Sequence, residues 1–386
     1  MNSCIISNMK SILFLGPTAA ASLAQRFGFN IQPLNFALMY SLIAFSQYIS
    51  PSYWFTIYST LFVVHEILNF TKNIQILSDD ERVDSSYQWF DQYLDKKADT
   101  DLTEGYFKDD VWTVSSETAL VQKYDKFYEL LGLKPGMKVL DLGCGYGDWM
   151  KYLRNNGVES VGLTLSQNHN MRCLNDGLVT RIGDARNIPV DLHGKFDAVT
   201  MLGSVEHMAK ASWSLADTNN VYSNLFEQSR AALKSKTKSG KVLITVINRP
   251  ENFTLDKMTY TEIAYSYLLE RHFSGRYPHT GQIFEAAPKG FTRVFESDQT
   301  EDYRYISIIN SNHFGNFVIK FDTMRKLAYV PFMFLSDPYA LHKWLYYMTG
   351  AWMWQFGGTS SNPGRTRRAP FRLKWEVYDL KNPRPV

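Results

Sequence analysis

The sequence predicts an α/β protein built around a doubly wound parallel sheet. Between residues 117 and 247, short apolar runs alternate with segments of helical periodicity, and strands that alternate with helices form parallel sheets. A glycine-rich turn, Gly-Cys-Gly-Tyr-Gly at 143–147, follows the first of these strands. Glycines between a strand and a helix allow the backbone to approach a ligand closely. The two features together predict a nucleotide-type site at the carboxyl edge of the sheet.

Each predicted element rests on its apolar pattern. Val139 and Leu140 belong to the first strand, and Trp149, Met150 and Leu153 recur at helical spacing after the turn. The other elements follow from the same alternation along the chain. Helices are predicted at 117–132, 148–156, 167–175 and 218–234, and strands at 137–142, 159–165, 178–182, 196–202 and 241–247.

The glycine turn differs from a dinucleotide-binding fingerprint. That motif has the form G-x-G-x-x-G, whereas here position 148 is aspartate and Gly147 comes one residue early. A dinucleotide site also has an acidic residue about 20 residues further on, which holds the ribose. The second strand here ends in Thr-Leu-Ser at 164–166 instead. The sequence therefore favours a different nucleotide-type ligand.

The pattern at 139–147, with Asp141 before the glycines, resembles motif I of the class I S-adenosylmethionine (SAM) methyltransferases. The Gly-Leu-Thr-Leu-Ser segment at 162–166 is similar to the branch that contains the cyclopropane-fatty-acid synthases and the mycolic acid methyltransferases. Further segments that match this branch in order and spacing are Tyr106-Phe107, Lys123-Tyr124-Asp125, 132–136 and 203–208. The resemblance implies a Rossmann-like fold and SAM as the methyl donor.

The resemblance also implies which residues bind SAM. Gly143 and Gly145 would pack against its methionine and ribose portions, with Asp141 behind the loop. Thr164 and Leu165 would hold the ribose and the edge of the adenine.

Three later residues complete the implied cofactor site. Asp184 and Ala185, after the third strand, would bind the adenine amino group, and Leu202 would line the pocket. An aspartate in a plain turn is the alternative for Asp184.

Members of this branch hold a bicarbonate that takes a proton from the carbocation formed when a methyl group is transferred to an alkene. The resemblance implies that only the glutamate among its ligands is kept here, as Glu206. Glu104 stands in place of a cysteine, Thr245 in place of a histidine, and the tyrosine position falls near Phe314. A bound bicarbonate is therefore doubtful.

Two carboxylates could do the same work directly. A carboxylate stabilises a developing carbocation and can act as a general base, most effectively where burial raises its pKa. We therefore predict Glu206 and Glu104 as catalytic residues, although Glu104 could also be an exposed acid of a linker. The pair would suit a cationic substrate such as an amine equally well. His207 is a third candidate, more typical of a residue that orients the loop.

The N-terminal part of the sequence predicts a membrane hairpin. Residues 34–50 and 53–70 are apolar and contain no Lys or Arg, and each is close to the roughly 20 residues that span a bilayer. Lys10, Arg26 and Lys72 flank the pair, which places both ends and the catalytic domain in the cytosol. A buried pair of helices in a soluble protein is the alternative.

Four regions follow from these patterns. They are a membrane-associated hairpin at 1–72, a linker and cofactor lid at 73–116, the SAM-binding core at 117–250, and a substrate-binding cap with the remaining strands and helices at 251–386. In the cap we expect strand-like alternation at 292–311 and helices within 315–357. Aromatic residues at 327–356 suggest a channel for an apolar substrate or a membrane-facing surface. The arginines at 365–372 suggest contacts with phosphate headgroups or a solvated tail.

Composition excludes some functions. The net charge is +3 and the sequence lacks a long basic run with interleaved aromatic residues, so nucleic-acid binding is not favoured. The three cysteines have no CxxC spacing, which is typical of a reducing compartment and does not indicate a zinc site.

These features favour a membrane-anchored, SAM-dependent methyltransferase that acts on an unsaturated acyl chain of a lipid and forms a methyl-branched, methylene or cyclopropane product. An N- or S-methyltransferase of an amine, thioether or lipid headgroup is the first alternative, because the bicarbonate ligands are missing. A catalytically silent scaffold that binds SAM or lipid is the second. The sequence does not indicate an oligomeric state.

Overall fold

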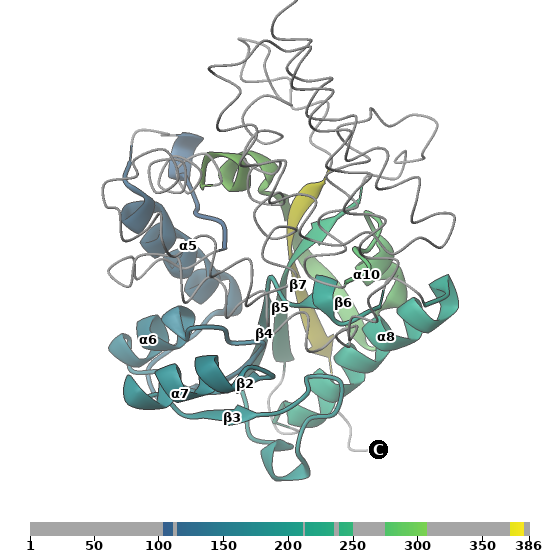
Figure 1. The fold of residues 1–386 in the computed structure, drawn as a ribbon, viewed down its shortest axis with the longest axis horizontal. Helices are drawn as coiled ribbons and strands as arrows, with labels where there is room; N and C mark the ends of the chain where they lie inside the picture. The colour runs from purple at the N-terminus through teal and green to yellow at the C-terminus, as the bar shows by residue number, and fades with distance from the viewer. Residues whose placement is uncertain are drawn as a thin grey trace, which may run out of the picture. The chain divides into compact units, whose positions relative to one another are not determined.

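The computed structural model describes residues 103–110, 114–210, 213–234, 239–249, 275–306 and 371–381, which belong to one compact unit of the chain. Within these residues, seven strands form a single sheet in the order β3-β2-β1-β4-β5-β7-β6 (Figure 1). The strands are β1 (Lys138–Leu142), β2 (Glu159–Thr164), β3 (Thr180–Ile182), β4 (Ala198–Leu202), β5 (Ser239–Asn248), β6 (Phe291–Asp298) and β7 (Arg372–Lys381).

The sheet is parallel from β3 to β5 and antiparallel at β7. The pairs β2–β3, β1–β2, β1–β4 and β4–β5 are parallel, whereas β7 runs antiparallel to both β5 and β6. All 10 residues of β7 pair with β5, from Arg372 opposite Asn248 to Lys381 opposite Ser239. The predicted doubly wound sheet is confirmed, with the difference that a strand from the C-terminal part of the chain enters it in the opposite direction.

Helices cover both faces of the sheet. Figure 1 shows α5, α6 and α7 together on one side and α8 and α10 on the other. Two hydrophobic clusters match these layers, one around Phe127, Trp149 and Trp375 and the other around Tyr222 and Phe226. The helices are α5 (Ser116–Leu131), α6 (Asp148–Asn155), α7 (Gln167–Asn175), α8 (Leu215–Ala232) and α10 (Gln282–Ala286), with 3-10 turns η1 (Lys108–Asp110), η2 (Val190–Leu192) and η3 (Val205–His207).

Local chemistry explains where the helices begin. The Ser115 hydroxyl accepts a hydrogen bond from the backbone N–H of Thr118 at the start of α5. Ser214 and Asp217 form a capping box at the start of α8, in which each side chain accepts from the backbone N–H of the other. Such caps satisfy the backbone donors that the first turn of a helix leaves without partners.

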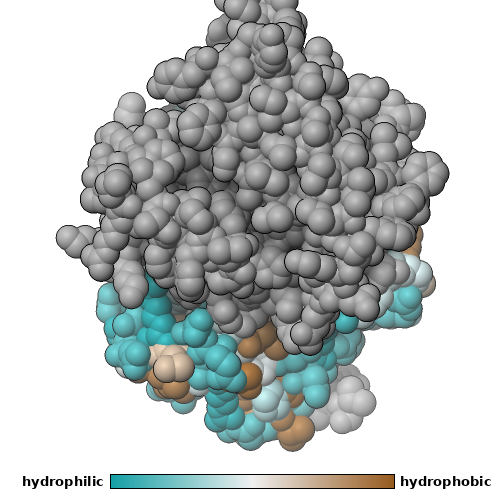
Figure 2. All heavy atoms as spheres, in the orientation of Figure 1, coloured by the Kyte–Doolittle hydropathy of each residue, from teal (hydrophilic) through white to brown (hydrophobic). Residues whose placement is uncertain are grey.

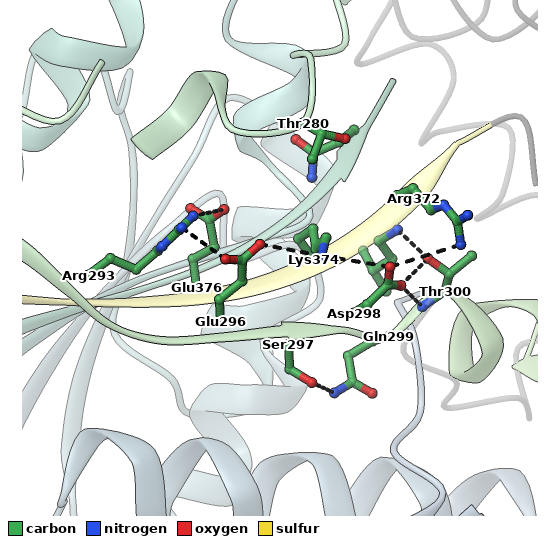
Figure 3. Close-up of polar contacts among 12 residues, drawn as sticks. Thr280, Arg293, Glu296, Ser297, Asp298, Gln299, Thr300, Arg372, Lys374 and Glu376 are labelled. Carbon is green, nitrogen blue, oxygen red and sulfur yellow. Dashed lines mark hydrogen bonds and ion pairs between the residues drawn. The ribbon is translucent and has the colours of Figure 1, made fainter. Parts of the chain in front are cut away.

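β6 and β7 are joined by a row of charged side chains (Figure 3). Arg293 of β6 ion-pairs with Glu296 at 2.9 Å and with Glu376 of β7 at 3.4 Å. Arg372 and Lys374 of β7 lie 4.0 Å and 3.7 Å from a carboxylate oxygen of Asp298. Of the two alternatives for the arginines at 365–372, the solvated tail is therefore wrong for Arg372, because this residue belongs to a strand of the sheet. The sequence did contain a strand signal, because apolar residues occur at alternate positions here: Leu373, Trp375 and Val377. The structure buries all three.

The end of the predicted linker packs against the core. The side chains of Glu104 and Phe107 are each only 2% exposed. The backbone N–H of Tyr106 donates to the Ala119 carbonyl at 2.9 Å, and that of Phe107 donates to Asp302 Oδ1 at 3.1 Å. This segment is therefore held by both α5 and the residues that follow β6.

Several predictions differ from the structure or concern residues that it does not describe. The strand predicted at 292–311 ends at Asp298, and residues 300–306 are helical. The hairpin predicted at 34–50 and 53–70, the helices within 315–357 and Phe314 lie outside the described residues. Among the residues that are described, no helix is long and apolar enough to cross a membrane. The described surface in Figure 2 is mostly hydrophilic, with separate hydrophobic patches.

Candidate active site

The glycine turn joins β1 to α6, and its three glycines serve different purposes. Gly143, Gly145 and Gly147 all have positive φ, at 82°, 51° and 78°. A Cβ atom on Gly143 would lie 2.6 Å from Ser204 Cβ, and one on Gly147 would lie 2.5 Å from Leu178 Cδ1. A Cβ atom on Gly145 would meet nothing within 4 Å. Gly143 and Gly147 are therefore required by packing, whereas Gly145 borders open space of the kind that a bound ligand fills.

The turn is anchored to its neighbours by backbone and side-chain hydrogen bonds. The N–H groups of Gly143 and Cys144 donate to the carbonyl of Leu163 in β2, at 2.8 and 3.0 Å. Asp141 is buried in β1 and accepts a hydrogen bond of 2.7 Å from the Thr200 hydroxyl of β4. Asp141 thus lies behind the loop, where the resemblance places it, and links the first and fourth strands.

The end of β2 supplies one polar and one apolar group. Thr164 is buried, and its hydroxyl accepts from the backbone N–H of Ser166 at 3.2 Å. Leu165 is 46% exposed, which is high for a leucine between a central strand and a helix. An exposed apolar side chain beside the glycine turn suits contact with a flat base. The role of both residues in cofactor binding stays a prediction.

The residues after β3 and β4 are held by their own contacts. The Asp184 carboxylate accepts from the backbone N–H of Arg186 at 2.8 Å and ion-pairs with its guanidinium at 2.8 Å. Carboxylate oxygens have several acceptor positions, so this pair still leaves room for another donor. Ala185 is 5% exposed and belongs to the core, and Leu202 is partly buried against the cluster on the α5 side.

Glu206 lies in η3, just after β4 reaches the carboxyl edge of the sheet. Its side chain is 2% exposed, and its Oε2 atom has no hydrogen-bond partner among the described residues. Burial, together with the neighbouring carboxylate of Glu104, raises the pKa of Glu206 to about 8, while backbone groups of Glu206 itself and Ile247 oppose the shift. A buried carboxyl group with a pKa near neutrality is typical of a general acid or base.

Glu104 approaches Glu206 from a distant part of the sequence. A Cβ atom on Gly203 would lie 3.6 Å from Thr103 Cγ2 and 4.0 Å from Glu206 Oε1. The segment that carries Glu104 and the carboxylate of Glu206 therefore border the same glycine. The structure brings the two predicted acids together, and it shows that Glu104 is not an exposed linker acid.

Trp375 of β7 positions Glu104. Its indole N–H donates a hydrogen bond of 2.5 Å to Glu104 Oε1, and its ring lies 5.5 Å from that of Tyr106. The adjacent Thr103 accepts a hydrogen bond from the fully buried ammonium group of Lys123. Trp375 could not be found from the sequence, because nothing local to residue 375 shows which acid it contacts.

His207 follows Glu206 in η3. Burial lowers its pKa to about 4, so its imidazole is neutral at physiological pH. Its ring lies 6.2 Å from that of Tyr277, in an edge-on arrangement. These contacts suit a residue that shapes the loop, and its predicted catalytic role stays a prediction.

A loop at 275–281 packs directly on the backbone of η3. A Cβ atom on Gly275 would lie 2.2 Å from the carbonyl oxygen of Glu206, so only glycine fits there. The backbone N–H of Arg276 donates to the Ala209 carbonyl at 2.8 Å. This loop, also missed from the sequence, fixes the position of Glu206.

Thr245 occupies the position where the resemblance places a bicarbonate-binding histidine. It is fully buried in β5, and its hydroxyl accepts from the backbone N–H of Gly203 at 2.9 Å. A bicarbonate here would also face two carboxylates, Glu104 and Glu206. The residues present therefore do not fit a bound bicarbonate.

The strand order, the glycine turn and the acid after β4 together define the fold of the class I methyltransferases. Solved structures with this fold align with most of the chain. A mycolic acid cyclopropane synthase, CmaA1, complexed with SAH and CTAB, has a TM-score of 0.58 at 19% identity and covers 79% of this chain and 99% of its own. The cyclopropane synthase MmaA2 from Mycobacterium tuberculosis has a TM-score of 0.57 at 17% identity and covers 79% of this chain and 100% of its own.

The chain belongs to the mycolic acid cyclopropane synthetase family, whose model matches residues 72–308. Cyclopropane-fatty-acyl-phospholipid synthase of Escherichia coli K12 is 34% identical over 102 residues, which are 25% of this chain and 26% of that protein. Cyclopropane mycolic acid synthase 3 of Mycobacterium tuberculosis is 32% identical over 156 residues, which are 38% and 47% of the two chains. The chain thus spans about a quarter to a half of the length of these curated relatives.

Proposed function

We propose that this protein is a SAM-dependent methyltransferase that modifies a lipid at an unsaturated acyl chain. The observation that carries the proposal is the buried pair of acids, Glu104 and Glu206, at the sheet edge where the glycine turn borders open space. Methyl transfer to an alkene creates a positive charge on carbon, and such a pair can stabilise that charge. The names of the curated relatives support a lipid as the acceptor.

The residues at the turn fit SAM. Gly145 leaves the space that a cofactor needs, Leu165 offers an apolar surface for its base, and Asp141 supports the loop from behind. When bound, SAM supplies an electrophilic methyl group on a sulfonium centre. The protein contributes proximity and a site from which water is largely excluded.

Glu206 would hold the proton that leaves the substrate. Its Oε2 atom, which has no partner in the part of the chain that the structure describes, can accept a proton from the carbon skeleton. A positive charge nearby favours the ionised form that does so. Loss of this proton from the transferred methyl group closes a cyclopropane ring. If a 1,2-hydride shift first moves the positive charge to the methylated carbon, loss of a proton from the same methyl group leaves a methylene group. A saturated methyl branch requires a hydride donor as well. Glu104, held by Trp375, would add a second negative charge to the site.

A second candidate function has support from the same acids. A buried carboxylate pair also attracts a cationic substrate, so transfer of the methyl group to an amine is the alternative. Such a reaction forms no carbocation, and its base needs only to remove a proton from nitrogen.

The decisive experiment supplies the full-length protein with SAM that carries a deuterated methyl group. Vesicles of phospholipids with one cis double bond per chain form one set of substrates, and small amines form the other. Mass spectrometry should show a gain of one methylene unit in the acyl chain, with two deuterium atoms kept if the transferred methyl group gives up the proton. Label confined to amines or headgroups would select the alternative function, and no label in either set would reject both.

We also propose that residues 34–70 attach the protein to a membrane, with the catalytic domain in the cytosol. The support is the apolar sequence of 34–50 and 53–70 and the basic residues that flank it. The full-length protein should sediment with membranes after extraction with alkaline carbonate. Its release by carbonate would contradict an anchored hairpin.

A further inference from the structure

Two arginines from separate segments converge at the carboxyl end of β5. Arg249 directly follows this strand and pairs with His279 of the 275–281 loop in an isolated β-bridge. Its backbone N–H donates to the Pro278 carbonyl at 2.7 Å, and the backbone N–H of Thr280 donates to the Arg249 carbonyl at 2.9 Å. The loop that carries Arg276 is therefore tied alongside Arg249.

The same loop is tied to the backbone that carries Glu206. Gly275 packs on the Glu206 carbonyl, and the Tyr222 hydroxyl donates to the Arg276 carbonyl at 3.0 Å. Glu206, Arg276 and Arg249 all act electrostatically on this hydroxyl. The two arginines therefore share a neighbourhood with the predicted general base.

The charged groups of Arg249 and Arg276 repel one another, and both disfavour the charged form of His279. Burial and the charge of Arg276 both lower the pKa of Arg249. Burial, Arg249 and Arg276 lower the pKa of His279, while Glu285 of α10 opposes that shift. A bound anion interacts favourably with like charges that are brought together in a partly buried place.

We propose that Arg249 and Arg276 bind a phosphate group of the methyl acceptor, with its apolar chain directed toward Glu206. A guanidinium has five N–H donors in a planar fork that matches phosphate oxygens. Among the described residues, Arg276 uses one donor on the Trp213 carbonyl, which leaves others for a ligand. The two guanidinium groups have enough N–H donors for the three free oxygens of a phosphate monoester, which also carries more negative charge than a carboxylate. The inference rests on the proposed function, because it names the substrate of the same site.

Direct binding tests the site without requiring turnover. Inorganic phosphate is titrated into the full-length protein by calorimetry, with acetate as the carboxylate comparison. The wild type should bind phosphate more tightly than acetate, and R249Q and R276Q should each lower the phosphate affinity about 10-fold or more. R181Q is the matched control, because Arg181 carries the same charge on β3 and pairs with the exposed Asp191. R249K and R276K keep the charge, and they should bind phosphate with intermediate affinity even if a glutamine variant fails to fold.

Two substrate sets then identify the source of the phosphate. Vesicles of dioleoylphosphatidic acid present the phosphate group on a membrane lipid, and a soluble unsaturated alkyl phosphate presents it in solution. Dioleoylglycerol has no phosphate group and is the comparison. R249Q should raise KM about 10-fold for the phosphorylated acceptor that is used, with a smaller change in kcat and no effect on dioleoylglycerol. The proposed site is overturned if R249Q, R276Q and R181Q bind phosphate with equal affinity. It is also overturned if the wild type binds acetate more tightly than phosphate. If the wild type binds phosphate but methylates no lipid, the proposed function fails and the anion site stands.

Discussion

The indole N–H of Trp375 donates a hydrogen bond to the carboxylate of Glu104 across 271 positions of the sequence. Both side chains are almost completely buried. β7 thus brings a hydrogen-bond donor to one member of the acid pair, and the other member, Glu206, comes from the end of β4. The pair depends on three distant segments of the chain.

Replacing Trp375 with Phe should destabilise the protein by more than the change in volume explains. The substitution removes the donor to a buried carboxylate, which costs roughly 1–3 kcal/mol. Trp149→Phe is the control, because Trp149 is equally buried and its indole N–H has no hydrogen-bond partner in the described part of the chain. Urea unfolding of the two variants measures the difference. Equal losses of unfolding free energy would show that the contact with Glu104 contributes nothing.

Glu206→Gln should slow methyl transfer about 100-fold while leaving SAM affinity unchanged, because it removes the base and keeps its shape. In the wild type, kcat/KM should rise with pH through a midpoint near 8, since the pKa of the free enzyme governs this parameter. The variant should lose this rise. Glu129→Gln is the control, because Glu129 is exposed and pairs only with Lys126 among the described residues. A normal rate and pH profile in Glu206→Gln would remove this residue from the mechanism.

The same carboxyl group predicts how stability depends on pH. Its pKa is higher in the folded protein, about 8, than in the unfolded chain. The folded state therefore binds more protons between the two values, and the contribution of Glu206 to the unfolding free energy falls as the pH rises toward 8. Denaturation at several pH values should show that the unfolding free energy declines less steeply with pH in Glu206→Gln than in the wild type. Parallel curves for the two proteins would contradict the raised pKa.

Gly145→Ala should weaken SAM binding at least about 10-fold and leave the fold intact. The added methyl group occupies the space beside the turn, and the positive φ adds strain of order 1 kcal/mol. Gly194→Ala is the control, because Gly194 also has positive φ and open space at its Cβ position but lies before β4, at the opposite edge of the sheet. Calorimetry with SAM measures both variants. Unchanged affinity in a folded Gly145→Ala protein would place the cofactor elsewhere.

Gly275→Ala should move Glu206 without touching the glycine turn. Its methyl group would collide with the Glu206 carbonyl, so η3 must shift. We expect kcat to fall about 10-fold or more, SAM affinity to persist, and the midpoint of the kcat/KM profile to move below 8 as water reaches the carboxylate. Gly281→Ala is the control in the same loop. Its φ of 87° makes alanine strained there, but the nearest atom to a Cβ is the flexible end of Glu285 at 3.8 Å, so no backbone of η3 has to move. An unchanged midpoint would show that the loop does not position Glu206.

The sequence predicted the elements between residues 116 and 248 because their apolar patterns are local. The glycine turn and Glu206 could be found in the same way, since each follows directly from a strand end. The burial of Glu104 could not be predicted, because it depends on Trp375. This residue lies in β7, a strand that pairs with the distant β5. The role of Gly275 could not be predicted either, since glycine is required there by the carbonyl oxygen of Glu206, which belongs to another segment.

The antiparallel insertion of β7 has a consequence for the newly made chain. While the ribosome has not yet delivered residues 372–381, β5 lacks its outer partner and β6 has no neighbour in the described sheet. Such open strand edges are where unfinished chains join one another. Glu104 also lacks the Trp375 donor until that moment. The arrival of β7 thus completes the described sheet and gives Glu104 its donor in one step, so a chain that has not yet reached β7 has open strand edges and an incompletely held acid pair.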